Sequence, residues 1–243
     1  MIPERIRRPE ARKLAEEEFR RFAELMGSLS EDDWTRPTDC TAWDVRKLAL
    51  HVLGSADAQA SFLQFLHQLR RGLPLNKTID SHHWVDGLNE LQISERSHLS
   101  NDAVVAQLGT VGPRAVKGRW STPPPMRYLP LPFGPPIGWA PLKYLLDLGF
   151  TRDVWIHRID VCVATGSDVH LTPDHDGRLV ADIVAEWASI HREPFEVVLG
   201  GPAGGAYSQG VNGERVDIDA VEFIRVLAGR RPGTGVLSHP LPL

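Results

Sequence analysis

The sequence has few cysteines, no long apolar run and no large excess of one charge. Only two of the 243 residues are cysteine, Cys40 and Cys162, which is too few for a disulfide framework but does not exclude a single pairing. No segment approaches the roughly 20 apolar residues that cross a bilayer, and the charged N-terminal stretch lacks the apolar core of a signal peptide. We therefore expect a soluble, cytoplasmic protein.

The charges nearly balance. Lysine and arginine number 27 and aspartate and glutamate 31, which gives a formal net charge of −4. Neither sign gathers in long runs, so the sequence does not indicate a surface for nucleic acid or for an anionic membrane. We expect small-molecule partners and a monomer or small homo-oligomer. With 42% hydrophobic residues, the chain is long enough for one large domain, or for one good-sized domain and a small one.

The first half of the chain has the pattern of a helical body. Apolar residues at helical spacing predict an amphipathic helix over residues 8–26. A second helix is predicted over residues 41–71, with Thr41 and Asp44 forming a capping box at its start. A third helix and a shorter partner are predicted over residues 86–98 and 101–109.

A proline-rich stretch interrupts this body. Eight prolines occur from Pro123 to Pro141, so we expect an ordered or semi-ordered loop without regular structure. Long loops inside compact domains are often functional.

The second half begins with helices and ends with strands. A largely apolar helix is predicted over residues 142–164, closed by Gly166, and another from Thr172, its N-cap, to His191. Turn-bounded segments then predict three strands, a helix and a last strand, over residues 195–201, 205–210, 214–219, 220–230 and 234–241. We predict a mainly α fold, with a helical bundle over residues 1–166 and a connecting helix and small α/β domain over residues 167–243.

The helix at residues 142–164 carries an unusual polar line. Asp153, His157 and Asp160 are spaced four and three residues apart, so they share one face among apolar neighbours. A buried charge needs a partner. One interpretation is a hydrogen-bonded carboxylate and imidazole, with Arg152 or Arg158 in solvent. The other is that Asp153 and His157 are two ligands of a metal ion. From this helix alone, the first interpretation is favoured.

A second helix carries a similar anomaly. His51 lies on the apolar side of its helix, where an imidazole needs a partner. If the two helices face one another, His51, Asp153 and His157 supply three ligands and leave a fourth position open, which is the catalytic arrangement for zinc. The adjacent His82 and His83 lie in a predicted loop, and sequence neighbours seldom bind one ion well, so we leave them out of the set.

At these residues the sequence resembles a known family. The segments DWTRPTDCTAWDVRKLALHVLG and GFTRDVWIHRIDV resemble the two metal-site segments of the mycothiol-dependent maleylpyruvate isomerase family, part of the DinB-like four-helix superfamily. The segments DGLNELQISER and DAVEFIRVLAGRRPGTGVL resemble its third helix and its smaller C-terminal domain, less specifically. The resemblance covers most of the chain and implies a DinB-like four-helix bundle followed by a small α/β domain.

The resemblance also implies a site and a reaction. It implies Zn²⁺, or another divalent metal, bound by His51, Asp153 and His157. The thiolate of mycothiol would add to a conjugated double bond of a small electrophile, and elimination after rotation would complete an isomerisation. Without elimination the same site is an S-transferase. The Gly-Arg ending implies that Arg230 closes over the thiol, although a cation at a helix C-terminus explains Arg230 equally well.

Other roles and functions stay open. We predict that the Asp160 carboxylate orients an imidazole by accepting its N–H. We predict that Arg158 binds a substrate carboxylate, with the alternative that it is only a solvated charge. The family usually has glutamate where this chain has Asp153, which is one methylene shorter. The alternatives are a hydrolase using metal-bound water and a non-catalytic DinB-like binding or stress protein. Absence of an HExxH segment mildly favours thiol chemistry over hydrolysis.

Overall fold

The computed structural model describes residues 1–80 and 83–242, so His82 lies outside the described residues. The chain divides into two compact units. Unit 1 comprises residues 1–14, 125–159 and 168–243, and unit 2 comprises residues 15–124 and 160–167. Within the described ranges, no helix combines the length and apolar character that crossing a membrane requires.

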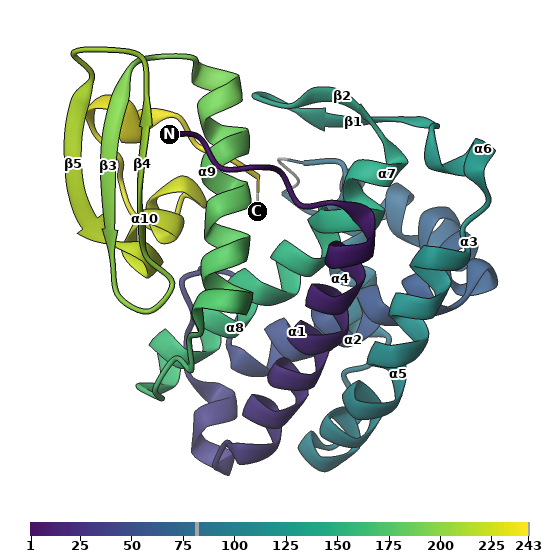
Figure 1. Ribbon diagram of the computed structural model, residues 1–243. Helices are drawn as coiled ribbons and strands as arrows, with labels where there is room; N and C mark the ends of the chain where they lie inside the picture. Colours follow the sequence, from purple (N-terminus) through teal and green to yellow (C-terminus); the bar gives the residue numbers. More distant parts are fainter. Residues whose placement is uncertain (81–82, 243) are drawn as a thin grey trace. The chain divides into compact units, whose positions relative to one another are not determined.

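Unit 2 consists of helices and their connections. Most of the first helix belongs to it. Its helices are α1 (Arg8–Ser28), α2 (Val45–Ala60), α3 (Phe62–Gly72), α4 (Asp86–Ser94) and α5 (Asn101–Ser121) (Figure 1). The apolar core is contributed by residues that are almost fully buried: Phe19, Phe22, Met26, Leu48, Val52, Leu108 and Val116.

Glycines allow the helices of unit 2 to approach closely. A Cβ atom on Gly118 of α5 would lie 2.0 Å from the backbone oxygen of Gln59 on α2. About 120° round α5 from Gly118, a Cβ on Gly112 would lie 2.9 Å from Cβ of Phe19 on α1. Helix packing at these points therefore requires a residue without a side chain.

The predicted helix over residues 41–71 is wrong in two respects. Asp44, not Thr41, is the N-cap of α2, and its carboxylate accepts a hydrogen bond from Lys47 N at 2.7 Å. The chain then breaks at Ser61, which has extended dihedrals (φ −142°, ψ 119°) and is both the C-cap of α2 and the N-cap of α3. A continuous apolar pattern across residue 61 concealed this break.

The helix predicted over residues 101–109 is twice as long in the structure. Helix α5 runs to Ser121 and contains Pro113. A proline inside a helix removes one backbone hydrogen bond and costs roughly 3 kcal/mol. The close packing of Gly112 on α1 and of Gly118 on α2 accounts for the continuation, because burial of these two sides of α5 offsets that cost.

The proline-rich segment also has regular structure, contrary to the prediction. It contains α6 (Pro124–Arg127) and an antiparallel hairpin of β1 (Pro130–Gly134) and β2 (Gly138–Pro141), in which Leu131 pairs with Ala140. Both strands of a two-stranded sheet are edge strands. Prolines are therefore tolerated, because the hydrogen bond they cannot donate would point away from the partner strand.

Unit 1 contains the helices of the second half of the chain. After α7 (Leu142–Tyr144) and one π-helical segment (Leu145–Gly149), α8 (Phe150–Thr165) carries the polar line, and its last residues belong to unit 2. Gly166 ends α8 with φ +72°, as predicted. A second π-helical segment (Pro173–Gly177) leads into α9 (Arg178–His191), with Thr172 before it.

The C-terminal part of unit 1 is a small sheet with one further helix. Strands β3 (Phe195–Gly200), β4 (Gly205–Gln209) and β5 (Glu214–Asp219) are in the order β4-β3-β5, with β3 antiparallel to β4 and parallel to β5. Helix α10 (Ala220–Leu227) lies against this sheet (Figure 1). Trp187 of α9 packs on both the sheet and α10, because its ring centroid lies 4.8 Å from that of Phe195 on β3 and 5.4 Å from that of Phe223 on α10.

The strand predicted over residues 234–241 is absent from the structure. Residues Gly235–Ser238 form a 3₁₀ helix instead. Gly235 has φ +55°, and Val236 N donates to the Glu214 carboxylate at 2.8 Å. This side-chain contact takes a backbone donor that a strand would have used in a sheet.

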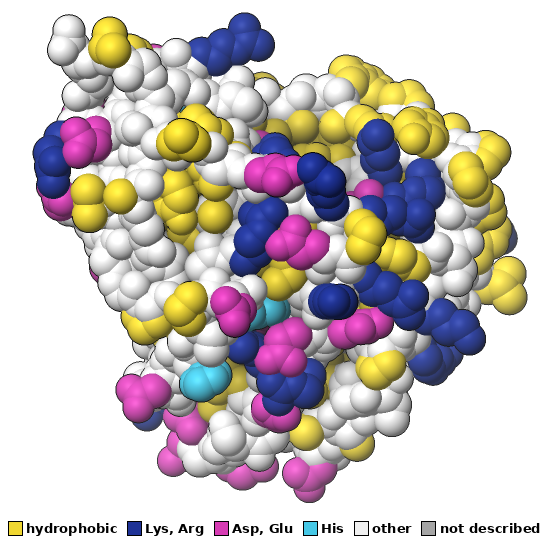
Figure 2. Space-filling view, viewed as in Figure 1, with side chains coloured by type: hydrophobic (Ala, Val, Ile, Leu, Met, Phe, Trp, Pro, Cys, Tyr) yellow, Lys and Arg dark blue, Asp and Glu magenta, His cyan; other side chains and the backbone are white. Residues whose placement is uncertain are grey.

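The mainly α fold with a small C-terminal sheet is confirmed. Acidic and basic side chains are interspersed on the face shown in Figure 2, as the balanced charge indicates. The predicted boundary near Gly166 stays a prediction about domains.

Two glycines of α5 give a matched test of this packing. Gly118→Ala should lower the free energy of unfolding by about 1–3 kcal/mol, because its Cβ meets a backbone oxygen that has little room to move. Gly109→Ala, with nothing within 4 Å, should raise it by about 0.5–1 kcal/mol through helix propensity. Urea denaturation of both variants measures the difference, and equal effects would contradict the packing.

Candidate functional site

The first part of the site is a pair on α8. His157 and Asp153 lie one turn apart, with His157 Nε2 3.5 Å from Asp153 Oδ1. The imidazole is nearly buried, whereas the side chain of Asp153 is 29% exposed. Two ligands of a tetrahedral zinc ion lie about 3.3 Å apart when each bond is about 2.0 Å long. The pair therefore has a spacing that suits a shared ion.

His51 occupies a buried position on α2. Its ring lies 4.9 Å from that of Trp43, in the segment before the helix. Trp43 is itself held by backbone contacts, since its N–H donates to Cys40 O at 2.7 Å and its carbonyl accepts from the Thr38 hydroxyl at 2.8 Å. His51 belongs to unit 2, and Asp153 and His157 to unit 1. That all three bind one ion stays a prediction.

Arg158 has a defined partner and is not a solvated charge. Its side chain is almost fully buried, and it donates to Asp176 at 2.5 Å and to the carbonyl of His170 at 3.3 Å. Asp176 also accepts from Trp155 Nε1 at 3.0 Å. The alternative that Arg158 is only a solvated cation is therefore wrong, because its guanidinium is enclosed in unit 1.

The environment of Asp176 favours its charged form. Burial by itself would raise the pKa of this carboxyl, but the charge of Arg158 and hydrogen bonds from Trp155 and from Thr172 N hold it below its usual range. The net direction is downward. The ion pair is thus present at neutral pH and joins α8 to the start of α9.

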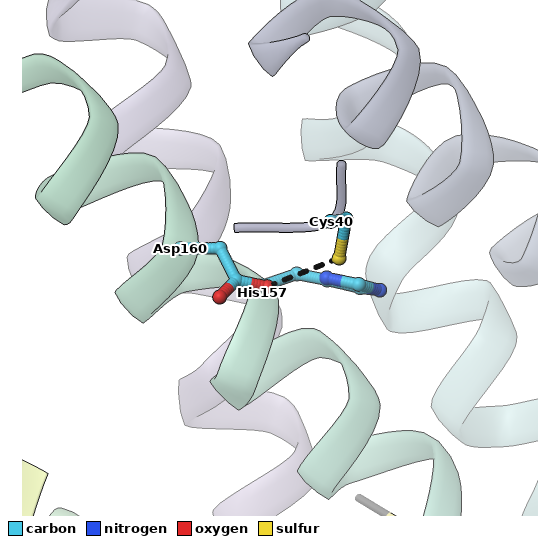
Figure 3. Close-up of side chains that lie close together, drawn as sticks. All are labelled: Cys40, His157 and Asp160. Atoms are coloured by element: carbon cyan, nitrogen blue, oxygen red, sulfur yellow. Dashed lines mark hydrogen bonds between the residues drawn. The ribbon is translucent and has the colours of Figure 1, made fainter. Parts of the chain in front are cut away.

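Asp160 lies beyond His157 on the same helix and contacts a cysteine. The thiol of Cys40 donates to Asp160 Oδ2 with a sulfur–oxygen distance of 3.5 Å, within unit 2 (Figure 3). Asp160 is 1% exposed. The segment before α2, which holds Cys40 and Trp43, therefore contacts the C-terminal end of α8.

Arg152 is also buried, contrary to the interpretation that it lies in solvent. It donates to Glu186 at 2.6 Å and to Asp182, both on α9. Arg5, near the N-terminus, donates to the same two carboxylates at 2.9 Å each. These four charged side chains thus form one network, and the charges of Arg152 and Arg5 outweigh burial and hold the pKa of Asp182 below its usual range.

Sequence reasoning missed Asp176, Asp182 and Glu186. The last two are spaced four residues apart on the apolar α9, which is the pattern that drew attention to Asp153 and His157. The same argument about buried charge indicates that this pair needs a cationic partner. The spacing of Asp182 and Glu186 does not show which cation pairs with them.

Arg230 lies in the turn after α10. Gly229 has φ +73°, and Arg230 N donates to Arg225 O at 2.8 Å. Its guanidinium donates to Ala228 O at 3.1 Å, and the residue is partly exposed. Contact of Arg230 with a thiol cofactor stays a prediction.

Comparisons with known proteins agree on one family. The model of the mycothiol maleylpyruvate isomerase N-terminal domain matches residues 15–162. Two crystal structures of the mycothiol-dependent maleylpyruvate isomerase, one of a mutant, are similar in fold, each with a TM-score of 0.58. They are 17% and 18% identical in sequence and cover 93% of this chain and 90% of theirs. The predicted DinB-like fold is thereby confirmed. No curated protein sequence matches.

Removal of the charge on Asp176 should be strongly destabilising. Asp176→Asn should lower the free energy of unfolding at pH 7 by about 3 kcal/mol, since the buried Arg158 loses the charge of this partner. A lowered folded-state pKa stabilises the protein above pH 3.8, and this contribution is lost as the pH falls through the folded-state value. The difference in unfolding free energy between the variant and the wild type should therefore persist from pH 7 down to pH 3.8 and narrow only at lower pH. Asp174→Asn, an exposed neighbour, is the control and should change little.

Proposed function

Because the chain belongs to the mycothiol maleylpyruvate isomerase family, whose N-terminal domain model matches residues 15–162, we propose that it is a metal-dependent enzyme that uses mycothiol. It would isomerise a small electrophilic substrate, or transfer the thiol to it. The observation that carries the proposal is the 3.5 Å pairing of His157 with Asp153 on a largely buried helix. Both residues, and His51, lie within the matched segment.

The donor set fits a divalent metal, and we propose His51, Asp153 and His157 as its ligands. Two imidazoles and one carboxylate are a common set for catalytic zinc. When bound, such an ion lowers the pKa of a coordinated thiol or water, which supplies a nucleophile at neutral pH. The shorter Asp153 replaces the family's usual glutamate, and its spacing from His157 is still short enough for both side chains to serve as ligands.

The two reactants of the proposed reaction are a thiol and an activated alkene. The sulfur electron pair forms a C–S bond at one alkene carbon, and the π electrons move onto the adjacent electron-withdrawing group. Rotation about the resulting single bond follows. Return of those electrons expels the thiolate and restores the alkene in its other geometry. If a proton is taken up instead, the thioether is the product and the enzyme is an S-transferase.

The roles of the other residues follow from their contacts. Because Arg158 is paired with Asp176, we propose it as a positioning residue that orients α8, and not as a group that meets a substrate carboxylate. For Asp160 we propose a positioning role at the end of the same helix, where it receives the Cys40 thiol. Arg230 is proposed to bind mycothiol.

A hydrolase is the second candidate function. The same three ligands suit metal-bound water. The family relation favours thiol chemistry, and a thiol requirement separates the two functions directly. A non-catalytic binding protein is the third candidate function. If it is correct, the protein should turn over no substrate, and its function should not require the three proposed metal ligands.

Metal binding can be tested on the ligand pair. Asp153→Asn should lose at least about tenfold in metal affinity, because a neutral amide oxygen is a weaker ligand than a carboxylate. Asp153→Glu should retain the metal. His51→Ala and His157→Ala should each abolish binding at this site. Elemental analysis and titration of metal-free protein with Zn²⁺ measure this, and unchanged affinity in both histidine variants would refute the ligand set.

The thiol requirement can be tested with Arg230. Turnover of an activated alkene should depend on added thiol, with mycothiol more effective than a simple thiol. Arg230→Ala should raise the mycothiol concentration that gives half-maximal rate, with metal content unchanged. Arg231→Ala, its exposed neighbour, is the control. Full activity without any thiol would refute the thiol requirement.

A further inference from the structure

A second group of metal-ligating side chains lies at the end of α9, among residues that the proposed function does not use. His191 is the last residue of the helix, Glu193 follows two positions later, and His239 comes from the segment after the 3₁₀ helix. Each offers a ligand atom, and these atoms all lie within 4.8 Å of one another. All three belong to unit 1.

The backbone holds the first two side chains together. Arg192, between them, has φ 60° and ψ 11°, a left-handed conformation that is uncommon for a residue with a side chain. This turn returns the chain toward the helix, so that Glu193 N donates to His191 Nδ1 at 3.0 Å. His191 Nδ1 is therefore unprotonated, which is the state that a metal ligand needs, and an ion bound there would take the place of the Glu193 N–H.

The third side chain is fixed from the other direction. The carbonyl of His239 accepts a hydrogen bond from Trp187 Nε1 of α9 at 3.1 Å. Pro240 follows and restricts His239 to extended conformations. His239 Nε2 lies 3.1 Å from Glu193 Oε1, and its ring centroid lies 5.2 Å from that of His191.

These distances suit a common ion. In a tetrahedral zinc site the centroids of two bound imidazoles lie about 5 Å apart, because each lies about 3.2 Å from the metal when the Zn–N bond is about 2.0–2.1 Å. The separation of 5.2 Å agrees with that value. The two rings are stacked with planes 13° apart, so one ring has to rotate for both nitrogens to point at the ion. Glu193 and His239 are partly exposed, with side chains 55% and 36% accessible, so an ion can enter from solvent.

We propose that His191, Glu193 and His239 form a second binding site for a divalent transition metal such as Zn²⁺. The ion would be bound by His191 Nδ1, a carboxylate oxygen of Glu193 and His239 Nε2. The His239 ring would then carry its proton on Nδ1. Water completes the coordination. Because one ligand comes from residue 239, the ion joins the C-terminal segment to the end of α9.

Another exposed histidine–carboxylate pair provides the control. His67 Nε2 lies 2.6 Å from Glu95 Oε1, a closer pair than His239 and Glu193. Among the described residues, no third ligand completes that pair. A pair alone should bind zinc weakly, so the two places differ by the presence of the third ligand.

The test is a titration of untagged, metal-free full-length protein with Zn²⁺ by calorimetry, with circular dichroism to verify folding. The wild type should bind two ions, one at each proposed site, and His239→Ala should bind one. Glu193→Gln changes an exposed side chain and should weaken the second site by at least about tenfold. His67→Ala should still bind two ions. The double variant His51→Ala/His157→Ala should retain one ion, which His239→Ala should then remove.

The outcomes separate this site from the proposed catalytic one. If both His239→Ala and Glu193→Gln bind as many ions as the wild type, with unchanged affinity, the second site is refuted whatever the catalytic site does. If His239→Ala does not fold, Glu193→Gln decides alone. If ions are lost in these variants but not in His51→Ala/His157→Ala, the second site stands and the ligand set of the proposed function fails.

Discussion

The buried ion network of Arg152 with Asp182 and Glu186 determines how α8 is oriented. Arg152, Asp182 and Glu186 are removed from water and offset one another's desolvation cost, and the partly exposed Arg5 pairs with both carboxylates. The network fixes the rotation of α8 about its axis, because Arg152 must face α9. Since each residue of a helix advances by about 100°, Asp153 and His157 then lie about 100° and 140° round the helix from Arg152. The paired ligands therefore face away from the network.

Asp176 fixes a further side of α8, different from the side that faces the network and from the side of Asp153 and His157. Trp155 and Arg158 are three residues apart and both donate to its carboxylate. A helix with polar groups on every side is usually exposed, yet α8 is largely buried, because each polar group has a partner of matching chemistry. Two of its sides are thus used for structure. The remaining polar side carries Asp153 and His157, the two residues of this helix that we propose as ligands.

Local signals predicted most elements because their causes are local. Strands β3, β4 and β5 and helices α9 and α10 have the turn residues and periodicity that define them, and Gly166 ends α8 with the positive φ that favours glycine. The errors arose where a distant contact outweighed the local preference. Helix α5 passes through Pro113 because it packs on α1 and α2, and residues 235–238 are not a strand because Glu214 takes a backbone donor.

The sequence by itself determined the helical body and small sheet, and it identified Asp153, His157 and His51 as polar groups that apolar helices must compensate. Spacing along a helix is a local property, so the pairing of Asp153 with His157 follows from it. Only the tertiary structure decided the partners of Arg152 and Arg158, which lie 30 and 18 residues away on other segments. The same holds for His239, which meets Glu193 across 46 residues. Such long-range contacts depend on how distant segments pack together, and the periodicity of a segment carries no information about that packing.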